Sequence, residues 1–180
     1  TSRKEQIKAL FKDIHDNERD WAAEIESQPD NLFSSDKMFM YYMQMGKCAY
    51  SGENIPLTDV FNTNIYDIDH IYPQSKIKDD SLDNRVLCKK EYNQHIKKDV
   101  YPVSKEIRDK MRDIWAVWLD KKLISKEKYK RLTRSTPLTE VELSDFIDRQ
   151  LVETRQSTKA VATLLKRMYP DSEIVYSKAG

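Results

Sequence analysis

Apolar residues recur at spacings of three and four along most of the chain, which is typical of amphipathic helices. The first such stretch runs from Ser2 to Glu24. A second runs from Met38 to Met45, where Ser34 and Ser35 can cap the start and Gly46 can end the helix. The pattern therefore predicts two helices near the N-terminus.

The C-terminal part of the chain shows the same helical period. Ser104 precedes an apolar run that reaches Leu119, and Ser125 precedes a shorter one that ends near Leu132. Thr139 and Glu142 have the spacing of a capping box, which opens a long periodic stretch that ends at Pro170. The segment EIVYS beyond it reads as an edge strand that needs a partner sheet from elsewhere.

The middle of the chain has a different pattern. Residues 48–64 are rich in turn formers, and two short strands are predicted at 65–71 and 84–89, separated by a polar loop. Residues 90–98 then predict a short helix. The expected fold class is α+β and mostly helical, with a small two-stranded core surrounded by helices and long flanking linker helices.

Composition adds to this picture. Only three Gly occur in 180 residues, which favours long helices over tight turns. No stretch approaches the roughly 20 apolar residues of a membrane span, and no signal peptide opens the chain, so we expect a soluble, intracellular protein. Because the chain opens at Thr1 without a Met, it is compatible with a domain cut from a longer polypeptide whose ends are linkers.

Charge is unevenly distributed along the sequence. The formal net charge is +1, but residues 85–134 carry 16 Lys and Arg against seven acids, whereas residues 1–84 carry nine against 16. Such a basic segment is a candidate phosphate-binding surface or simply the solvated face of helices. Cys48 and Cys88 are too few for a zinc cage, and we expect both to be small buried side chains in a reducing compartment.

The segment YDIDHIYP, residues 66–73, places Asp67, Asp69 and His70 in the first predicted strand. Side chains alternate along a strand, so Asp69 and His70 can share a site only if the strand ends or twists there, which Pro73 favours. A carboxylate is a hard ligand for a divalent cation, and an imidazole is a base able to take a proton from water.

Spacing narrows the alternatives for this segment. An EF-hand loop fails, because Ile71 and Tyr72 stand where an acid and a Gly are needed. Asn84 begins the second strand and Asn93 lies on the short helix, which gives the order His, Asn, Asn. Two positions along a helix turn it by about 200°, so Asn93 and His95 cannot both face the site, and we choose Asn93. His15 reads as a surface residue.

This strand, loop, strand, helix layout resembles the HNH nucleases of the ββα-metal fold. The stretches YYMQMGKCAYSGE, YDIDHIYPQSKIKDDSLDNRVL and FIDRQLVETRQSTKAV are similar to the HNH domain, with its linkers, of the RNA-guided DNA endonuclease of type II CRISPR systems. The resemblance covers nearly the whole chain in order.

The resemblance implies roles for individual residues. His70 would be the general base, Asp69 and Asn93 the ligands of Mg²⁺, for which Mn²⁺ would substitute, and Asn84 a residue that steadies the site by orienting the loop of His70. Asp67 would be an outer-shell carboxylate, an occasional ligand, or a surface acid. Lysines on either side of the site could contact backbone phosphates, or could simply be solvated; they are Lys76, Lys78, Lys89, Lys90, Lys97 and Lys98.

The resemblance also implies an organisation and partners. Residues 1–34 would be an N-terminal linker helix, 35–134 the nuclease domain, and 135–180 a linker back to a RuvC-like domain. The substrate would be the DNA target strand of a guide RNA–DNA heteroduplex in the bacterial cytoplasm, with no membrane partner. The fragment is expected to be monomeric and its linkers to hinge. Two alternatives are a free-standing HNH endonuclease of homing or restriction type and a non-catalytic nucleic-acid-binding module.

Overall fold

The computed structural model describes the backbone of residues 1–168 and the side chains of 1–153, Thr163 and Lys166. It divides into two compact units, Thr1–Pro137 and Leu138–Gly180. The predicted strand EIVYS lies outside the described residues. The second unit contains α7 (Glu140–Met168), which begins with the predicted capping box: the amide of Glu142 donates to Thr139 Oγ1 at 3.1 Å, and the amide of Thr139 donates to Glu142 Oε1 at 3.2 Å.

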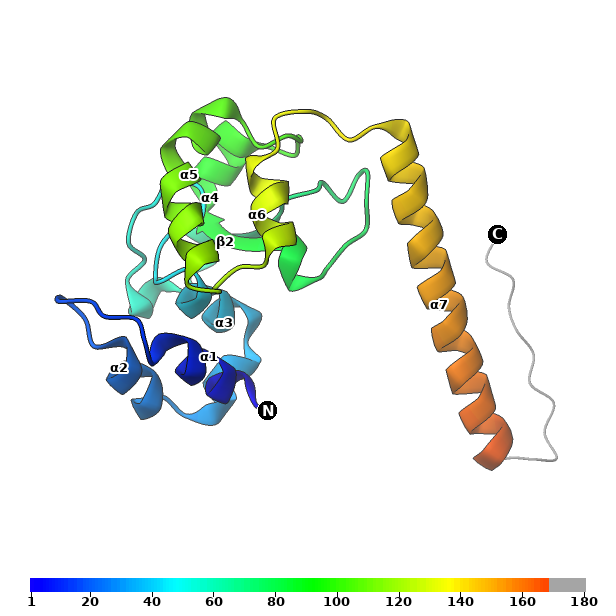
Figure 1. Cartoon of the computed structure of the whole chain (residues 1–180), viewed down its shortest axis with the longest axis horizontal. Coiled ribbons are helices and arrows are strands. Elements are labelled where there is room, and N and C mark those ends of the chain that lie inside the picture. The colour runs from blue at the N-terminus through cyan, green and yellow to red at the C-terminus, as the bar shows by residue number, and fades with distance from the viewer. Residues whose placement is uncertain (169–180) are drawn as a thin grey trace. The chain divides into compact units, whose positions relative to one another are not determined.

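The first unit is α+β and mostly helical, as predicted. In chain order its elements are α1 (Arg3–Phe11), α2 (Trp21–Ser27), η1 (Asp30–Ser34), α3 (Asp36–Met43), η2 (Leu57–Asp59), β1 (Tyr66–His70), η3 (Leu82–Asn84), β2 (Arg85–Lys89), α4 (Lys90–Tyr92), the π-helix η4 (Asn93–Lys97), α5 (Lys105–Asp120) and α6 (Lys126–Thr133). Figure 1 shows α1 to α3 grouped at one end of the unit and α5 and α6 at the other, with the sheet between them.

The prediction of one continuous helix over residues 2–24 is wrong. Polar side chains in the interval between α1 and α2 bind the backbone locally and compete with helical hydrogen bonds. Asp16 Oδ1 accepts from the amide of Glu18 at 2.9 Å, and Asp20 caps α2 by accepting from the amide of Ala23 at 3.1 Å. Apolar residues on the two sides of the break still pack together: the ring centroids of Phe11 and Trp21 lie 5.4 Å apart.

Other helix boundaries agree with the sequence pattern. Ser35, Ser104 and Ser125 each cap the helix that follows by accepting from a backbone amide. Gly46, with φ of 67°, lies just beyond α3, where a left-handed residue ends the helical path. Cys48 and Cys88 are both buried, as expected.

The sheet consists of β1 and β2 paired antiparallel, with Asp69 opposite Val86 and His70 opposite Arg85. The edge of β2 that does not pair with β1 faces the end of α3. There the side chain of Gln44, the C-cap residue of α3, exchanges two hydrogen bonds of 2.9 Å with the backbone of Leu87. From the other end of the unit, Trp115 of α5 donates from Nε1 to the Ala49 carbonyl at 2.9 Å. These buried polar contacts fix the position of the small sheet between the two groups of helices.

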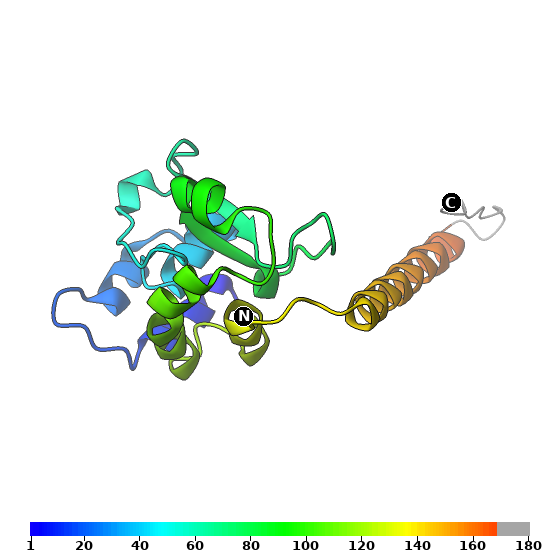
Figure 2. The same cartoon turned by 90° about the horizontal axis from the view of Figure 1, so that it is seen from above.

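The loop between β1 and η3 projects from the first unit in both Figure 1 and Figure 2. Its two ends are held by Asn84, the last residue of η3, whose carbonyl accepts from the amide of Ile71 at 2.8 Å. Among the described residues, no helix is both long enough and apolar enough to cross a bilayer.

Candidate active site

Strand β1 ends at His70, one residue before the end predicted from the sequence. Because regular pairing stops there, Asp69 and His70 both line one surface pocket although they are neighbours in the chain. The pocket has a volume of about 490 Å³. Its lining residues come from the end of β1, the loop after it, and the π-helix with the residues that follow: Asp69, His70, Gln74, Asn93, Gln94, Lys98 and Asp99.

Three of the residues singled out by the sequence therefore lie around one hollow: Asp69, His70 and Asn93. His95 is exposed and does not line this pocket. Asp67 is partly exposed on β1 and does not line it either. The short helix that carries Asn93 differs from the prediction, since only Lys90–Tyr92 is α-helical and Asn93–Lys97 forms a π turn. Single π turns of this kind occur often at functional sites.

The Asp69 carboxylate is held from the interior of the protein. Its Oδ2 accepts a 2.6 Å hydrogen bond from the Tyr50 hydroxyl and lies 3.1 Å from Lys97 Nζ. Burial, and next the neighbouring Asp69 charge, raise the pKa of Tyr50 well above its ordinary value, so the hydroxyl remains a donor at neutral pH. Neither Tyr50 nor Lys97 lines the pocket, so both contact Asp69 from behind.

The imidazole of His70 has its own carboxylate partner. His70 Nε2 lies 2.7 Å from Asp80 Oδ1, and the Gln74 side-chain nitrogen lies 3.2 Å from the same oxygen. An ionised carboxylate can only accept, so a neutral imidazole in this pair carries its proton on Nε2. Nδ1 then keeps the lone pair that a general base needs.

Asn84 lies behind the pocket and is fully buried. Its Oδ1 accepts from the amide of Tyr72 at 2.9 Å, and its Nδ2 donates to the carbonyls of Tyr72 and Asp79 at 3.2 and 2.9 Å. This one side chain therefore connects the two ends of the loop that carries Gln74 and Asp80. It does not line the pocket, so its geometry is that of a positioning residue.

The donor set of the pocket fits a hard divalent cation. Among the residues whose side chains are described, no three His, Cys, Asp or Glu residues cluster closely enough to hold a metal by themselves. Asp69 and Asn93 offer one carboxylate and one amide oxygen on the same pocket. Mg²⁺ commonly binds through one or two protein oxygens and takes its remaining ligands from water and substrate phosphate. The residues present thus suit Mg²⁺ or Mn²⁺ better than a softer metal.

Several residues of the site were missed by sequence reasoning. Tyr50, Gln74 and Asp80 carry no local signal, because each reaches the site through folding of a turn or loop. Lys97 was expected to be available for phosphates, and this is wrong: its side chain has 0% exposure. Its Nζ donates to the His70 carbonyl at 3.0 Å as well as facing Asp69. A lysine in a basic run looks the same in sequence whether it is solvated or buried.

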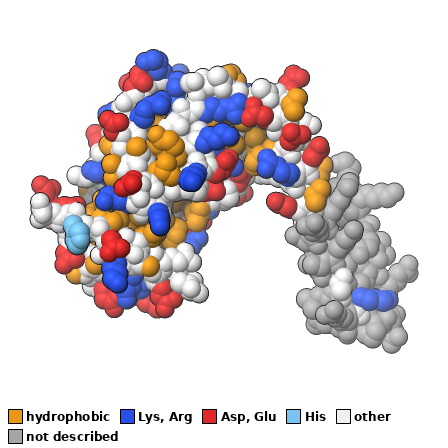
Figure 3. Space-filling model, viewed as in Figure 1, with side chains coloured by type: hydrophobic (Ala, Val, Ile, Leu, Met, Phe, Trp, Pro, Cys, Tyr) orange, Lys and Arg blue, Asp and Glu red, His pale blue; other side chains and the backbone are white. Residues whose placement is uncertain are grey.

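The charged surface is mixed. On the face shown in Figure 3, Lys and Arg side chains over the α5 and α6 end of the first unit alternate with acidic ones, so no continuous basic surface forms there. Lys98 lines the pocket and is exposed, which leaves it available for a substrate phosphate.

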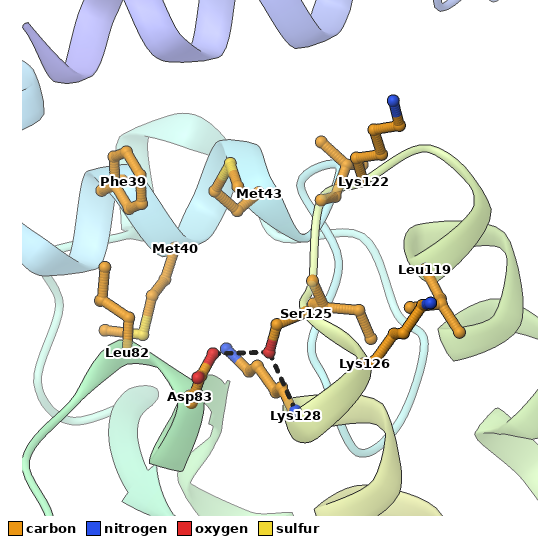
Figure 4. Close-up of a pocket in the computed structure, with 12 residues that line it drawn as sticks. Phe39, Met40, Met43, Leu82, Asp83, Leu119, Lys122, Ser125, Lys126 and Lys128 are labelled. Atoms are coloured by element: carbon orange, nitrogen blue, oxygen red, sulfur yellow. Dashed lines mark hydrogen bonds between the residues drawn. The ribbon is translucent and has the colours of Figure 1, made fainter. Parts of the chain in front are cut away.

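A second hollow, of about 500 Å³, contains none of these residues. Figure 4 shows it between Met40 and Met43 of α3, Leu82 of η3, and the segment that joins α5 to α6. Lys128 lines it with little exposure and donates from Nζ to the Arg85 carbonyl at 2.7 Å. Burial lowers the pKa of Lys128 to about 8, an effect that nearby Asp83 opposes.

Comparison with known proteins defines the class of this site. A family model described as HNH endonuclease matches residues 48–103, which include both strands and the π-helix. The chain therefore belongs to the HNH endonuclease family.

The similarity extends to a particular group of relatives. The chain is 42% identical over 142 residues to the CRISPR-associated endonuclease Cas9 of Streptococcus mutans, which covers 78% of this chain and 10% of that protein. It is also 42% identical over 137 residues to the Cas9 of Listeria innocua, with 75% and 10% covered, and 34% identical over 145 residues to that of Staphylococcus aureus, with 74% and 14% covered. The chain is thus an HNH domain of the Cas9 type and spans about a tenth of the length of the first two relatives.

Proposed function

We propose that this chain is the catalytic domain that hydrolyses a phosphodiester bond in the DNA strand paired with a guide RNA, within a larger CRISPR effector that acts against foreign DNA in the bacterial cytoplasm. The observation that carries the proposal is the meeting of Asp69, His70 and Asn93 at one pocket. Membership of the HNH endonuclease family and similarity to CRISPR-associated endonucleases support it.

Each residue has a proposed task in this reaction. His70, held through Nε2 by Asp80, takes a proton from the attacking water. Asp69 and Asn93 would hold the divalent ion, Mg²⁺ with Mn²⁺ as a substitute, which would supply charge stabilisation at the scissile phosphate and the leaving 3′ oxygen. Asn84 positions the loop, and Lys98 contacts a backbone phosphate. The products carry 5′-phosphate and 3′-hydroxyl ends.

Asp67 stays a peripheral residue in this proposal. It is partly exposed on β1 outside the pocket lining, so it can influence the ion through an intervening water or not at all.

We also propose the domain organisation expected from the sequence. Residues 1–34 form the N-terminal linker, 35–134 the nuclease domain, and 135–180 the linker back to the RuvC-like domain of the parent enzyme. The RuvC-like and recognition domains are its partners within that enzyme. The linkers hinge to deliver the pocket to the heteroduplex. Within the first unit, α1 and α2 pack beside η1 and α3, so the N-terminal connection would include a folded portion.

The proposal is tested in the context of a whole effector. The chain replaces the corresponding region of the Streptococcus mutans relative, and cleavage of each DNA strand is followed with separate end labels. We expect target-strand cleavage to require Mg²⁺ or Mn²⁺ and to fall by at least about a thousandfold in His70→Ala, Asp69→Ala and Asn93→Ala. His95→Ala is the matched control, since His95 is exposed and outside the pocket, and it should cleave normally.

The alternatives give different results. A free-standing endonuclease of homing or restriction type would cut duplex DNA at defined sequences as the 180-residue chain alone, without a guide. A non-catalytic module would bind nucleic acid but leave the target strand intact with every divalent metal. Target-strand cleavage that persists in His70→Ala would contradict the assignment of the base.

A further inference from the structure

Lys97 is the least expected residue of this site. Lysine side chains are rarely fully buried, because removing an ammonium from water is costly unless it is paired. Lys97 has 0% side-chain exposure, and its Nζ has two partners: Asp69 Oδ2 at 3.1 Å and the His70 carbonyl at 3.0 Å. It therefore holds two consecutive residues at the end of β1, one through the side chain and one through the backbone.

The π-helix carries both Asn93 and Lys97, but only Asn93 lines the pocket. Asn93 opens this turn and lines the pocket, whereas Lys97 closes it and lies behind the pocket wall. The amide of Lys98 donates to the Asn93 carbonyl at 2.7 Å, which closes the wide turn. The same short element thus supplies a proposed ion ligand on the pocket side and a fixed positive charge on the interior side.

The charges around the pocket are close to balance. The ionised side chains that line it are Asp69, Lys98 and Asp99, and Lys97 adds a positive charge directly behind Asp69. Asp80 contacts His70 but does not line the pocket. A divalent cation is attracted by net negative charge, but the ammonium of Lys97 already neutralises the Asp69 carboxylate. The anionic phosphate of a substrate would restore the missing negative charge.

We propose that Lys97 is a positioning residue that acts as a built-in counter-ion to Asp69: it fixes the carboxylate and weakens binding of a divalent ion until the substrate phosphate is present. This inference rests on the proposed function, since it concerns the same ion site. Tyr50 assists by donating to the same oxygen, so Oδ2 is occupied from the interior and the carboxylate is held in one orientation towards the pocket.

Equilibrium binding of Mn²⁺ to the 180-residue chain, followed by electron paramagnetic resonance without nucleic acid, tests this directly. In Lys97→Met and Lys97→Gln the counter-charge is removed, and we expect Mn²⁺ to bind at least about tenfold more tightly than to the parent chain. Cleavage in the whole effector should instead slow by about tenfold, because Asp69 is less well positioned. Tighter ion binding with slower cleavage is a combination that a merely structural lysine would not produce.

Lys37→Met is the matched control. Lys37 also donates from Nζ to a β1 carbonyl, that of Tyr66 at 3.2 Å, but at the opposite end of the strand from Asp69. Lys37→Met removes a lysine charge that also contacts β1, and Mn²⁺ binding should stay within about twofold of the parent chain. Urea unfolding in EDTA establishes which variants fold. If Lys97→Met does not fold, Lys97→Gln is the variant to measure, because it keeps a polar group at this position.

The outcomes separate this inference from the proposed function. Mn²⁺ binding that is unchanged or weaker in the folded Lys97 variants overturns the counter-ion role while leaving the ion site in place. If neither the parent chain nor any variant binds Mn²⁺, with or without a heteroduplex, the ion site itself fails, and the proposed function and this inference fall together.

Discussion

Asn84 and Tyr72 exchange two hydrogen bonds across the base of the loop that follows β1: Tyr72 N to Asn84 Oδ1 at 2.9 Å and Asn84 Nδ2 to Tyr72 O at 3.2 Å. The asparagine is fully buried and so satisfies backbone groups that water cannot reach. The order of the loop that carries Gln74 and Asp80 therefore depends on a residue that does not line the pocket.

Asn84→Ala should lower the free energy of unfolding by about 2 to 3 kcal/mol, because it removes a hydrogen-bond partner from two buried backbone groups of Tyr72 and from the part-buried carbonyl of Asp79. The cleavage rate should also fall, because the loop that carries Gln74 and Asp80 becomes less ordered. Urea unfolding measures the first effect. Asn54→Ala is the control, since the exposed Asn54 side chain accepts from Lys47 Nζ at the surface, and it should cost less than about 0.5 kcal/mol. Equal losses in the two variants would contradict the structural role of Asn84.

Asp80→Asn should slow cleavage by about tenfold, because the Nε2 of His70 loses its charged partner at 2.7 Å. Mn²⁺ affinity should stay within about twofold, since Asp80 does not line the pocket. Single-turnover kinetics with saturating metal separate the two effects. The control is Asp113→Asn, at an exposed position of α5, which should leave the cleavage rate unchanged. A full cleavage rate in Asp80→Asn would show that His70 needs no carboxylate partner.

The ion pair of Asp79 and Arg131, at 2.7 Å, predicts acid sensitivity of the first unit. Burial of Asp79 acts to raise its pKa, but the hydrogen bonds from Arg131 and Ser81 prevail and lower the pKa below the ordinary 3.8. A lowered folded-state pKa gives stability that is present above the unfolded value and lost as pH falls through the folded value. Asp79→Asn should therefore cost about 2 kcal/mol at pH 7, with the difference shrinking below pH 3.8.

Urea unfolding of the parent chain and Asp79→Asn at pH 7 and at pH 3 measures that difference, because the other carboxylates titrate alike in both proteins. A cost that does not change with pH would mean that the charge of Asp79 contributes nothing to the pair.

Lys128 predicts a pH dependence of the same sign as Asp79, but at alkaline pH. Burial lowers its pKa to about 8 from 10.5, so between these values the unfolded chain binds more protons than the folded one. Stability from this group must therefore rise with pH across that interval. Relative to Lys128→Met, the parent chain should gain about 2 kcal/mol between pH 7 and pH 10. A constant difference across this range, measured by urea unfolding, would show that the ammonium is well solvated.

Much of the local structure could be predicted from the sequence. Caps at Ser35, Ser104 and Ser125, and the capping box of Thr139 and Glu142, depend on hydrogen bonds between residues three or four apart. The two strands follow from the sequence pattern, and β1 ends at His70, one residue earlier than predicted. The choice of Asn93 over His95 for the pocket needed only the angular spacing along a helix and the resemblance to a known layout.

Tertiary structure decided the rest. Tyr50 lies 19 residues before its partner Asp69, and Lys97 lies 27 residues after His70, so both contacts depend on packing of distant segments. The break between α1 and α2 arose because Asp16 and Asp20 bind the backbone, in a segment whose apolar period alone indicates one helix. Periodicity and capping are properties of neighbouring residues, whereas burial of a charge depends on everything that surrounds it. The sequence alone therefore selected the residues that we propose as reactive, and only the folded chain determined which charges surround them.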